Sequence, residues 1–260
     1  MSMGKYIEIF KVNLKRSLMY RANFNMGLVG RIIEGLTLFY VWKSVYMAGS
    51  VKGYSFMTMV SYIILSMVIA PIFFPRHIFK IGDLVKTGKL SQYILKPYSF
   101  MGDIFAAELA NKVVDGVILS IIIILNYAMM TDNTETYFFL SVASLLINFL
   151  CMFVFGMLVG NIVFYLTDTW PLKPLYNALI MLAGGGYFPL DLLPKGVYNV
   201  VRFSPFPLFS YVNIKNLQGN IGFDEIIFYI NLSLFYLVLF LVLQQIIWNI
   251  SLKRYEEVLS

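Results

Sequence analysis

The sequence predicts an all-α integral membrane protein, on the basis of its composition and of six long apolar segments. Hydrophobic residues make up 59% of the 260-residue chain, charged residues make up 13%, and the mean hydropathy is +0.75. A soluble domain carries about 25% charged residues. A helix needs roughly 20 mostly apolar residues to cross a bilayer, because lipid offers backbone N–H and C=O groups no other partners. The segments of this length are residues 22–46, 56–75, 106–130, 137–166, 172–190 and 224–250.

These segments predict one membrane domain, residues 1–260, with both termini in the cytoplasm. Basic residues beside helix ends resist translocation, so they gather in cytoplasmic loops. The loops after the first, third and fifth segments contain only Lys52, Lys195, Arg202 and Lys215. All other loop bases lie at the termini or after the second and fourth segments. The net charge of +6 does not indicate nucleic acid binding, because the basic residues form no continuous stripe with stacking aromatic residues.

Residues 1–21 are predicted to form an amphipathic helix that lies in the cytoplasmic interface. They are too charged to span a membrane, and no cleavage site of small residues follows an apolar core. At helical spacing an apolar face lies opposite a charged face, as in interfacial helices. The apolar face contains Tyr6, Ile7, Phe10, Leu14 and Leu18, and the charged face contains Lys5, Glu8, Lys11, Lys15 and Arg16. The alternative is a charged tail that only sets topology.

Catalytic, cofactor-binding and metal-binding motifs are missing. Residues 82–90, GDLVKTGKL, resemble a phosphate-binding loop, but five residues separate the two glycines where that motif has four, and Leu90 replaces its Ser or Thr. The only histidine, His77, and the only cysteine, Cys151, lie in different segments. A metal site or a nucleophilic pair therefore has few residues to use. We expect no enzymatic activity in this chain.

Three charged residues are predicted within the membrane: Arg31, Glu34 and Asp115. Each costs about 2.5–3.5 kcal/mol at a helix centre, so each needs a partner or a role. Arg31 and Glu34 share a helical face, and mutual neutralisation is the simplest expectation, with a partner helix or a polar path as the alternative. Glu108 and Lys112 are expected at the interface, and Asp115 deeper. In the fourth segment, Gly156 and Gly160 would allow another helix to approach closely.

Two loops are longer than a turn requires. In residues 76–105, apolar residues recur at helical spacing beside basic ones, Gly88 interrupts the pattern, and Pro97 ends it. This pattern predicts a broken amphipathic element at the membrane surface, or else a solvated loop. Residues 191–223 follow a glycine run and are rich in proline, which predicts a re-entrant or interfacial hairpin packed against protein. The residues that indicate it are Gly185, Gly186, Pro189, Pro194, Pro205 and Pro207.

These features, in this order, resemble the permease subunit of a type-2 ATP-binding-cassette (ABC-2 type) exporter of the small, six-span bacterial kind. The resemblance covers nearly the whole chain. It rests on TGKLSQYILKP at 87–97, GGYFPLDLLP at 185–194 and FSPFPLF at 203–209. In the first motif, Gly88, Leu90 and residues 94–97 correspond to the family pattern of Gly-x-Leu, several residues and then Leu-x-x-Pro.

The resemblance implies a transport subunit in the bacterial cytoplasmic membrane, not an enzyme. A coupling helix after the second span would dock on a separate P-loop ATPase, which would hold the ATP and Mg²⁺, so this chain needs no cofactor. That role falls on Ile81, Asp83, Leu84, Lys86, Gly88, Lys89, Leu90 and Tyr93. Two permeases, as a homodimer or with a related chain, would move an amphipathic or hydrophobic substrate out of the cytoplasm between their first, second and fifth spans.

Two other classes of function stay open on the sequence. A non-transporting scaffold or sensor of an envelope complex would use the same spans only to position its loops. An ion-coupled secondary transporter would require a carboxylate near the bilayer midplane, and only Glu34 and Asp115 are available. Partnership with a P-loop ATPase distinguishes the permease from both.

Overall fold

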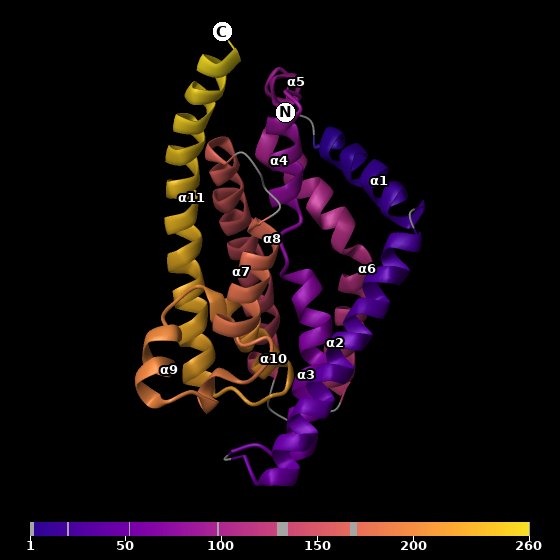
Figure 1. Cartoon of the computed structure of the whole chain (residues 1–260), viewed down its shortest axis with the longest axis vertical. Coiled ribbons are helices and arrows are strands. Elements are labelled where there is room, and N and C mark those ends of the chain that lie inside the picture. Colours follow the sequence, from indigo (N-terminus) through magenta and orange to yellow (C-terminus); the bar gives the residue numbers. More distant parts are fainter. Residues whose placement is uncertain are drawn as a thin grey trace.

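A computed structural model describes residues 3–19, 21–51, 53–97, 99–128, 135–166 and 171–259, and the regular elements in these ranges are all helices (Figure 1). In chain order they are α1 (Gly4–Met19), α2 (Arg21–Ala48), α3 (Phe56–Ile72), α4 (His77–Lys86), α5 (Leu90–Ile94), α6 (Phe100–Ala128), α7 (Glu135–Gly160), η1 (Asn161–Tyr165), α8 (Leu172–Ala178), η2 (Leu179–Ala183), η3 (Leu190–Leu192), α9 (Lys195–Val201), η4 (Phe206–Phe209), α10 (Tyr211–Leu217) and α11 (Phe223–Leu259). Here η1, η3 and η4 are 3₁₀ helices, and η2 is a π-helical turn.

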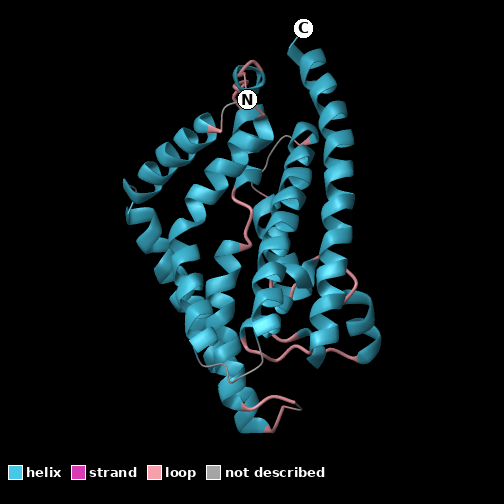
Figure 2. Ribbon diagram, turned by 180° about the vertical axis from the view of Figure 1, so that it is seen from behind, coloured by secondary structure: helices cyan, strands magenta, loops and turns pink. Residues whose placement is uncertain are grey.

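The long helices run between two ends of the molecule (Figures 1 and 2). One end, which we call the α5 end, carries α4, α5, the start of α1 and the C-terminal part of α11. The other, the α9 end, carries α9 and the connection between α2 and α3. Because the start of α1 and the end of α11 both lie at the α5 end, the two chain termini share one end, as the loop charges predict. Lys52, which contributed to the predicted orientation, lies outside the described residues.

Three stretches of the described chain are long and apolar enough to cross a membrane. They are Phe56–Lys86, Thr136–Tyr165 and Phe223–Lys253. Helix α3 begins at Phe56 because the Ser55 hydroxyl accepts a hydrogen bond from the Thr58 N–H at 3.1 Å. Helices α2 and α6 are of similar length, with 28 and 29 residues, but they carry charged side chains within the helix.

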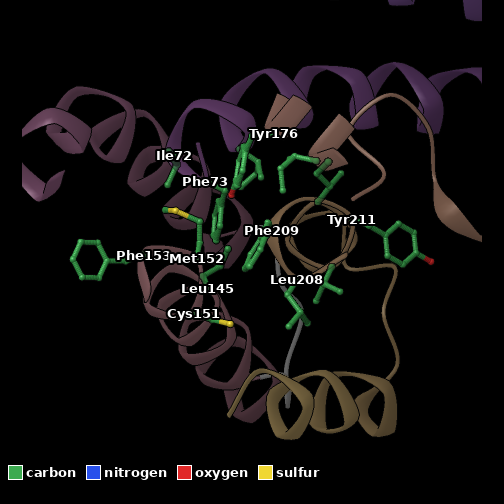
Figure 3. Close-up of a cluster of buried hydrophobic side chains, with 14 of the residues drawn as sticks. Ile72, Phe73, Leu145, Cys151, Met152, Phe153, Tyr176, Leu208, Phe209 and Tyr211 are labelled. Atoms are coloured by element: carbon green, nitrogen blue, oxygen red, sulfur yellow. The ribbon is translucent and has the colours of Figure 1, made fainter. Parts of the chain in front are cut away.

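The apolar core forms where α7, α11 and the segment from α8 to α10 meet α3. Figure 3 shows Phe73, Met152 and Phe209 gathered at its centre, and all three are at most 1% exposed. Phe155 joins the layers, with its ring 5.7 Å from that of Phe209 and 5.1 Å from that of Phe240. Aromatic rings from three elements thus interlock in the core, and such contacts contribute about 0.5–1.5 kcal/mol each beyond burial.

Helical structure in the fifth segment ends earlier than the predicted range 172–190. Helix α8 has seven residues and η2 adds five, up to Ala183. Twelve helical residues span about 18 Å, which is less than the roughly 30 Å of a bilayer core. The chain turns at Gly185, whose φ of +77° favours glycine. This segment therefore enters the core of the fold but does not continue as a helix to the α9 end.

The backbone after this turn is non-helical, and neighbouring helices satisfy its carbonyl groups. The Tyr62 hydroxyl donates to the Gly185 carbonyl oxygen at 2.5 Å, and the Ser66 hydroxyl donates to that of Gly186 at 2.9 Å. The Tyr211 N–H donates to the Gly184 carbonyl oxygen at 2.9 Å. Irregular backbone is tolerated at membrane depth only when it is buried against protein in this way.

Short helices and breaks alternate from residue 189 to residue 217, as the proline pattern predicts. Pro189, Pro194 and Pro205 immediately precede η3, α9 and η4, and Pro207 lies in the first turn of η4. Proline suits these positions because its fixed φ fits a helix start, where an N–H has no intrahelical partner.

Polar side chains join the segment from η3 to α10 to the α2–α3 connection at the α9 end. The Tyr54 hydroxyl donates to the Asp191 carboxylate at 2.8 Å, and Lys215 Nζ donates to the Tyr54 oxygen at 3.0 Å and to Asp191 at 3.1 Å. Burial and the hydrogen bond to Asp191 raise the pKa of Tyr54 above its ordinary value. The hydroxyl therefore remains protonated and keeps donating at physiological pH.

Helix α1 packs along the first part of α6 (Figure 1). The Tyr6 oxygen accepts a hydrogen bond from the Ser99 N–H at 3.1 Å, and its ring lies against Gly102. A side chain at Gly102 would collide with that ring, because an added Cβ would lie 2.5 Å from Tyr6 Cε1. The apolar face predicted for residues 1–21 thus supplies contacts to α6 through Tyr6, while Ile7 and Leu18 of the same face remain exposed.

Candidate functional site

The broken amphipathic element predicted in residues 76–105 is present as α4 and α5. Helix α4 ends at Lys86, and Gly88 adopts a φ of +67°, which reverses the chain before α5 begins at Leu90. A left-handed residue after a helix is the usual way to end it, and glycine takes that conformation without strain. The break therefore lies at Gly88, as the sequence predicts, and it places α5 at the tip of the molecule (Figure 1).

The eight residues assigned to coupling divide between a buried and an exposed face. Ile81, Leu84 and Leu90 are at most 7% exposed, so they hold the element against the fold and cannot contact a partner directly. Tyr93 is partly buried. The remaining four, Asp83, Lys86, Gly88 and Lys89, are exposed at the tip. We call these four residues and Leu95 the tip surface.

Leu95 stands out on the tip surface, since 85% of this leucine is exposed. It directly follows α5 and belongs to the ILKP run of the sequence motif, yet the sequence alone gave it no individual role. Leu95 lies beside exposed lysines in the motif that resembles the coupling element, which makes it a candidate contact for another protein.

An aromatic cluster fixes α5 to the last helix. The ring of Phe100 stacks on that of Trp248 at 4.8 Å with an interplanar angle of 14°, and Tyr93 meets Phe100 edge-on at 6.3 Å. The Lys96 ammonium lies 3.4 Å from the centre of the Tyr93 ring. Leu90 packs into the same cluster. The tip surface is therefore held on a rigid base that includes α6 and α11.

Charged side chains of α6 bind the free backbone groups where the chain breaks between α3 and α4. Lys112 Nζ donates to the Pro71 and Phe74 carbonyl oxygens, both at 2.5 Å, and the Arg76 N–H donates to Glu108 Oε1 at 3.3 Å. A helix end leaves carbonyl groups without partners, and a helix start leaves N–H groups without partners. A cation at the first and an anion at the second also match the helix dipoles.

Glu108 and Lys112 are buried within the protein, which the sequence pattern alone did not indicate. They are 1% and 5% exposed and lie 3.3 Å apart, and His77 Nδ1 lies 3.5 Å from Glu108. The other ring nitrogen of His77 is 3.0 Å from the Phe153 carbonyl oxygen of α7. The sequence gave a partial signal, because Glu108 and Lys112 are four residues apart on one helix face, but the partners on α3, α4 and α7 appear only in the fold.

Arg31 pairs with Asp115 and not with Glu34, which corrects the simplest expectation from the sequence. Arg31 Nη1 donates to Asp115 Oδ1 at 2.7 Å, and the Arg76 guanidinium lies 4.0 Å from the same carboxylate. Lys80, which lies one helical turn after Arg76, contacts Asp103 at 3.2 Å. The three carboxylates of α6, which are Asp103, Glu108 and Asp115, thus each contact a side chain of α4 or α2. We call these contacts the ladder of charges. The fold favours Arg31–Asp115 because both charges become neutralised below the surface.

Gly156 and Gly160 allow the segment that starts α4 to lie directly on α7. An added Cβ would be 2.6 Å from the Pro75 Cβ at Gly156 and 2.7 Å from the Ile81 Cδ1 at Gly160. The prediction that these glycines form a helix contact is confirmed.

We expect Gly156→Ala to lower the free energy of unfolding by about 1–3 kcal/mol, because the new methyl group overpacks a closed contact against Pro75. The matched control is Gly116→Ala on α6, where nothing lies within 4 Å of an added Cβ. That substitution should raise stability by about 0.5–1 kcal/mol, since alanine favours a helix. Denaturant titration in detergent micelles measures both, and equal effects of the two variants would contradict the contact.

The charged side chains of this site connect helices to one another. Among the described residues, no group of three His, Cys, Asp or Glu side chains could hold a metal ion. The charged groups of α6 are occupied in ion pairs or helix-end contacts. What the arrangement can do is carry a displacement, since α4 is joined by ion pairs to α6, α5 contacts α6 through the rings of Tyr93 and Phe100, and α6 is joined by an ion pair to α2.

The fold defines the class as a helical membrane protein. A family model for ABC-2 family transporter proteins matches residues 32–258, so the chain belongs to that family. Members are the membrane component of an ABC-type transporter, and the ATPase is a separate subunit. Curated protein sequences give no match to this chain.

Proposed function

We propose that this chain is the permease subunit of an ABC exporter in the bacterial cytoplasmic membrane. Two copies, or one copy and a related chain, move an amphipathic or hydrophobic substrate out of the cytoplasm by alternating access. ATP and Mg²⁺ bind to a separate P-loop ATPase. The α5 end faces the cytoplasm, and the six predicted segments, including the broken fifth one, form the membrane domain among its lipids.

The observation that carries this proposal is the tip surface together with the charges beneath it. Closure of the ATPase subunits displaces the docked α4–α5 element. Lys80–Asp103 and His77–Glu108–Lys112 pass that displacement to α6, and Asp115–Arg31 passes it to α2. Packed helices joined by buried ion pairs move as units, so a small displacement at the tip repositions whole helices.

The experiment is to purify the tagged protein in mild detergent from its native cells and to ask whether a P-loop ATPase accompanies it. Reversing two charges of the tip surface, with Lys86→Glu and Lys89→Glu together, should reduce the recovered ATPase about tenfold, because charge reversal at a contact removes its electrostatic complementarity. Lys195→Glu is the matched control, since this exposed lysine lies at the α9 end.

Each result bears on a specific alternative. Recovery of an ATPase with wild type and with Lys195→Glu, but not with the double variant, supports the permease. A chain that purifies without any ATPase would overturn the proposal in favour of a scaffold or an ion-coupled transporter.

A further inference from the structure

Glu34 is a carboxylate without a cation partner halfway along α2. Its side chain is exposed on the helix face, and no ion pair to it is found within the described ranges. Arg31, one turn away, is occupied by Asp115. Lys43 lies nine residues further, which is about 13 Å along a helix. A charge in a spanning segment is costly when it is unpaired, so a bound cation would stabilise the Glu34 carboxylate.

A cavity of about 470 Å³ opens beside this carboxylate. One wall is α2, with Glu34, Thr37 and Trp42, and the other is formed by Tyr187 and Phe188 after the break at Gly185. Cavities of this size hold small organic molecules. Apart from the carboxylate and a few polar atoms, the lining is apolar.

The aromatic wall of the cavity is fixed in place. Trp42 Nε1 donates to the Tyr187 carbonyl oxygen at 3.2 Å, which joins α2 to the fifth segment. Tyr187 and Glu34 line the same cavity, so the ring and the charge belong to one site. The side chains that line this cavity include three aromatic rings and no basic group. Aromatic faces beside a carboxylate attract organic cations, and such sites disfavour anions.

We propose that this cavity binds a lipophilic organic cation as the transported substrate, with Glu34 as the counter-charge and Trp42 and Tyr187 as its aromatic wall. The inference rests on the proposed function and narrows its substrate class.

Equilibrium dialysis against the full-length chain in nanodiscs of zwitterionic lipid tests the proposal, with labelled tetraphenylphosphonium as the probe and empty nanodiscs as background. We expect saturable binding that Glu34→Gln weakens at least tenfold and that Glu34→Asp weakens less. Asp224→Asn is the matched control, because it removes one exposed carboxylate at the start of α11 and should leave binding unchanged. Tetraphenylborate, of similar shape and opposite charge, should not compete.

Absence of saturable binding, equal binding by Glu34→Gln, or competition by tetraphenylborate would overturn the proposal. Unfolding midpoints of the variants establish that they are folded. ATPase recovery is measured on the same samples, and we expect Glu34→Gln to retain it, because α2 contributes nothing to the tip surface. An accompanying ATPase without cation binding would refute the substrate class alone, and cation binding without an ATPase would refute the exporter alone.

Discussion

Lys112→Met is expected to lower the free energy of unfolding by about 3–5 kcal/mol, the usual cost of removing one partner from a buried ion pair. The substitution leaves Glu108 without its cation and leaves the Pro71 and Phe74 carbonyl oxygens without a donor at the end of α3. Methionine fills a similar volume, so loss of packing contributes little. Denaturant titration of the purified protein in micelles measures the change.

The control is Lys11→Met on α1, which breaks an ion pair with Glu8 whose side chains are 56% and 68% exposed. Exposed pairs contribute roughly 0–1 kcal/mol, so this variant should remain close to wild type. The double variant Lys112→Met with Glu108→Gln should lose less stability than the sum of the two single variants, because it leaves no unpaired charge. A single variant as stable as the control would show that the helix break does not depend on Lys112.

Leu95→Asp is expected to weaken association with the ATPase about 30-fold or more, which corresponds to roughly 2 kcal/mol, a typical value for an interface hot spot. The side chain is 85% exposed, so the substitution removes apolar contact area and adds a charge without disturbing the fold. Affinity chromatography at a series of ATPase concentrations gives the change in dissociation constant.

Val200→Asp on α9 is the matched control for this variant. It places the same charge on an apolar residue that is 74% exposed at the opposite end of the molecule. Unchanged association of Val200→Asp together with loss for Leu95→Asp would assign docking to the tip surface. Equal behaviour of the two variants would place the ATPase contact elsewhere.

The sites involved in these predictions lie along one route through the molecule. The tip surface rests on the aromatic cluster of Phe100 and Trp248, and the ladder of charges begins directly beneath it. The ladder ends at Arg31, about one helical turn from Glu34 on α2. In the proposed mechanism, the partner contact and the substrate cavity therefore communicate through α6 and α2.

Much of the fold follows from patterns that are local in the sequence. Length and hydropathy define the long helices because lipid enforces internal hydrogen bonding of each one. Gly88 marks the break between α4 and α5, and the prolines mark the starts of η3, α9 and η4, since each is a constraint on φ at a single residue.

The sequence by itself therefore determined that this is a helical membrane protein, that the chain breaks at Gly88 and at the prolines before η3, α9 and η4, and which family it resembles. Only the tertiary structure decided the pairing of Arg31 with Asp115, the burial of Glu108 and Lys112, the early end of α8 and η2, and the exposure of Leu95. The physical reason is the separation in sequence between the interacting residues. Helix spans and turns depend on neighbours within a few residues, whereas the partner of a charge depends on which helices the fold places together, here residues 84 positions apart.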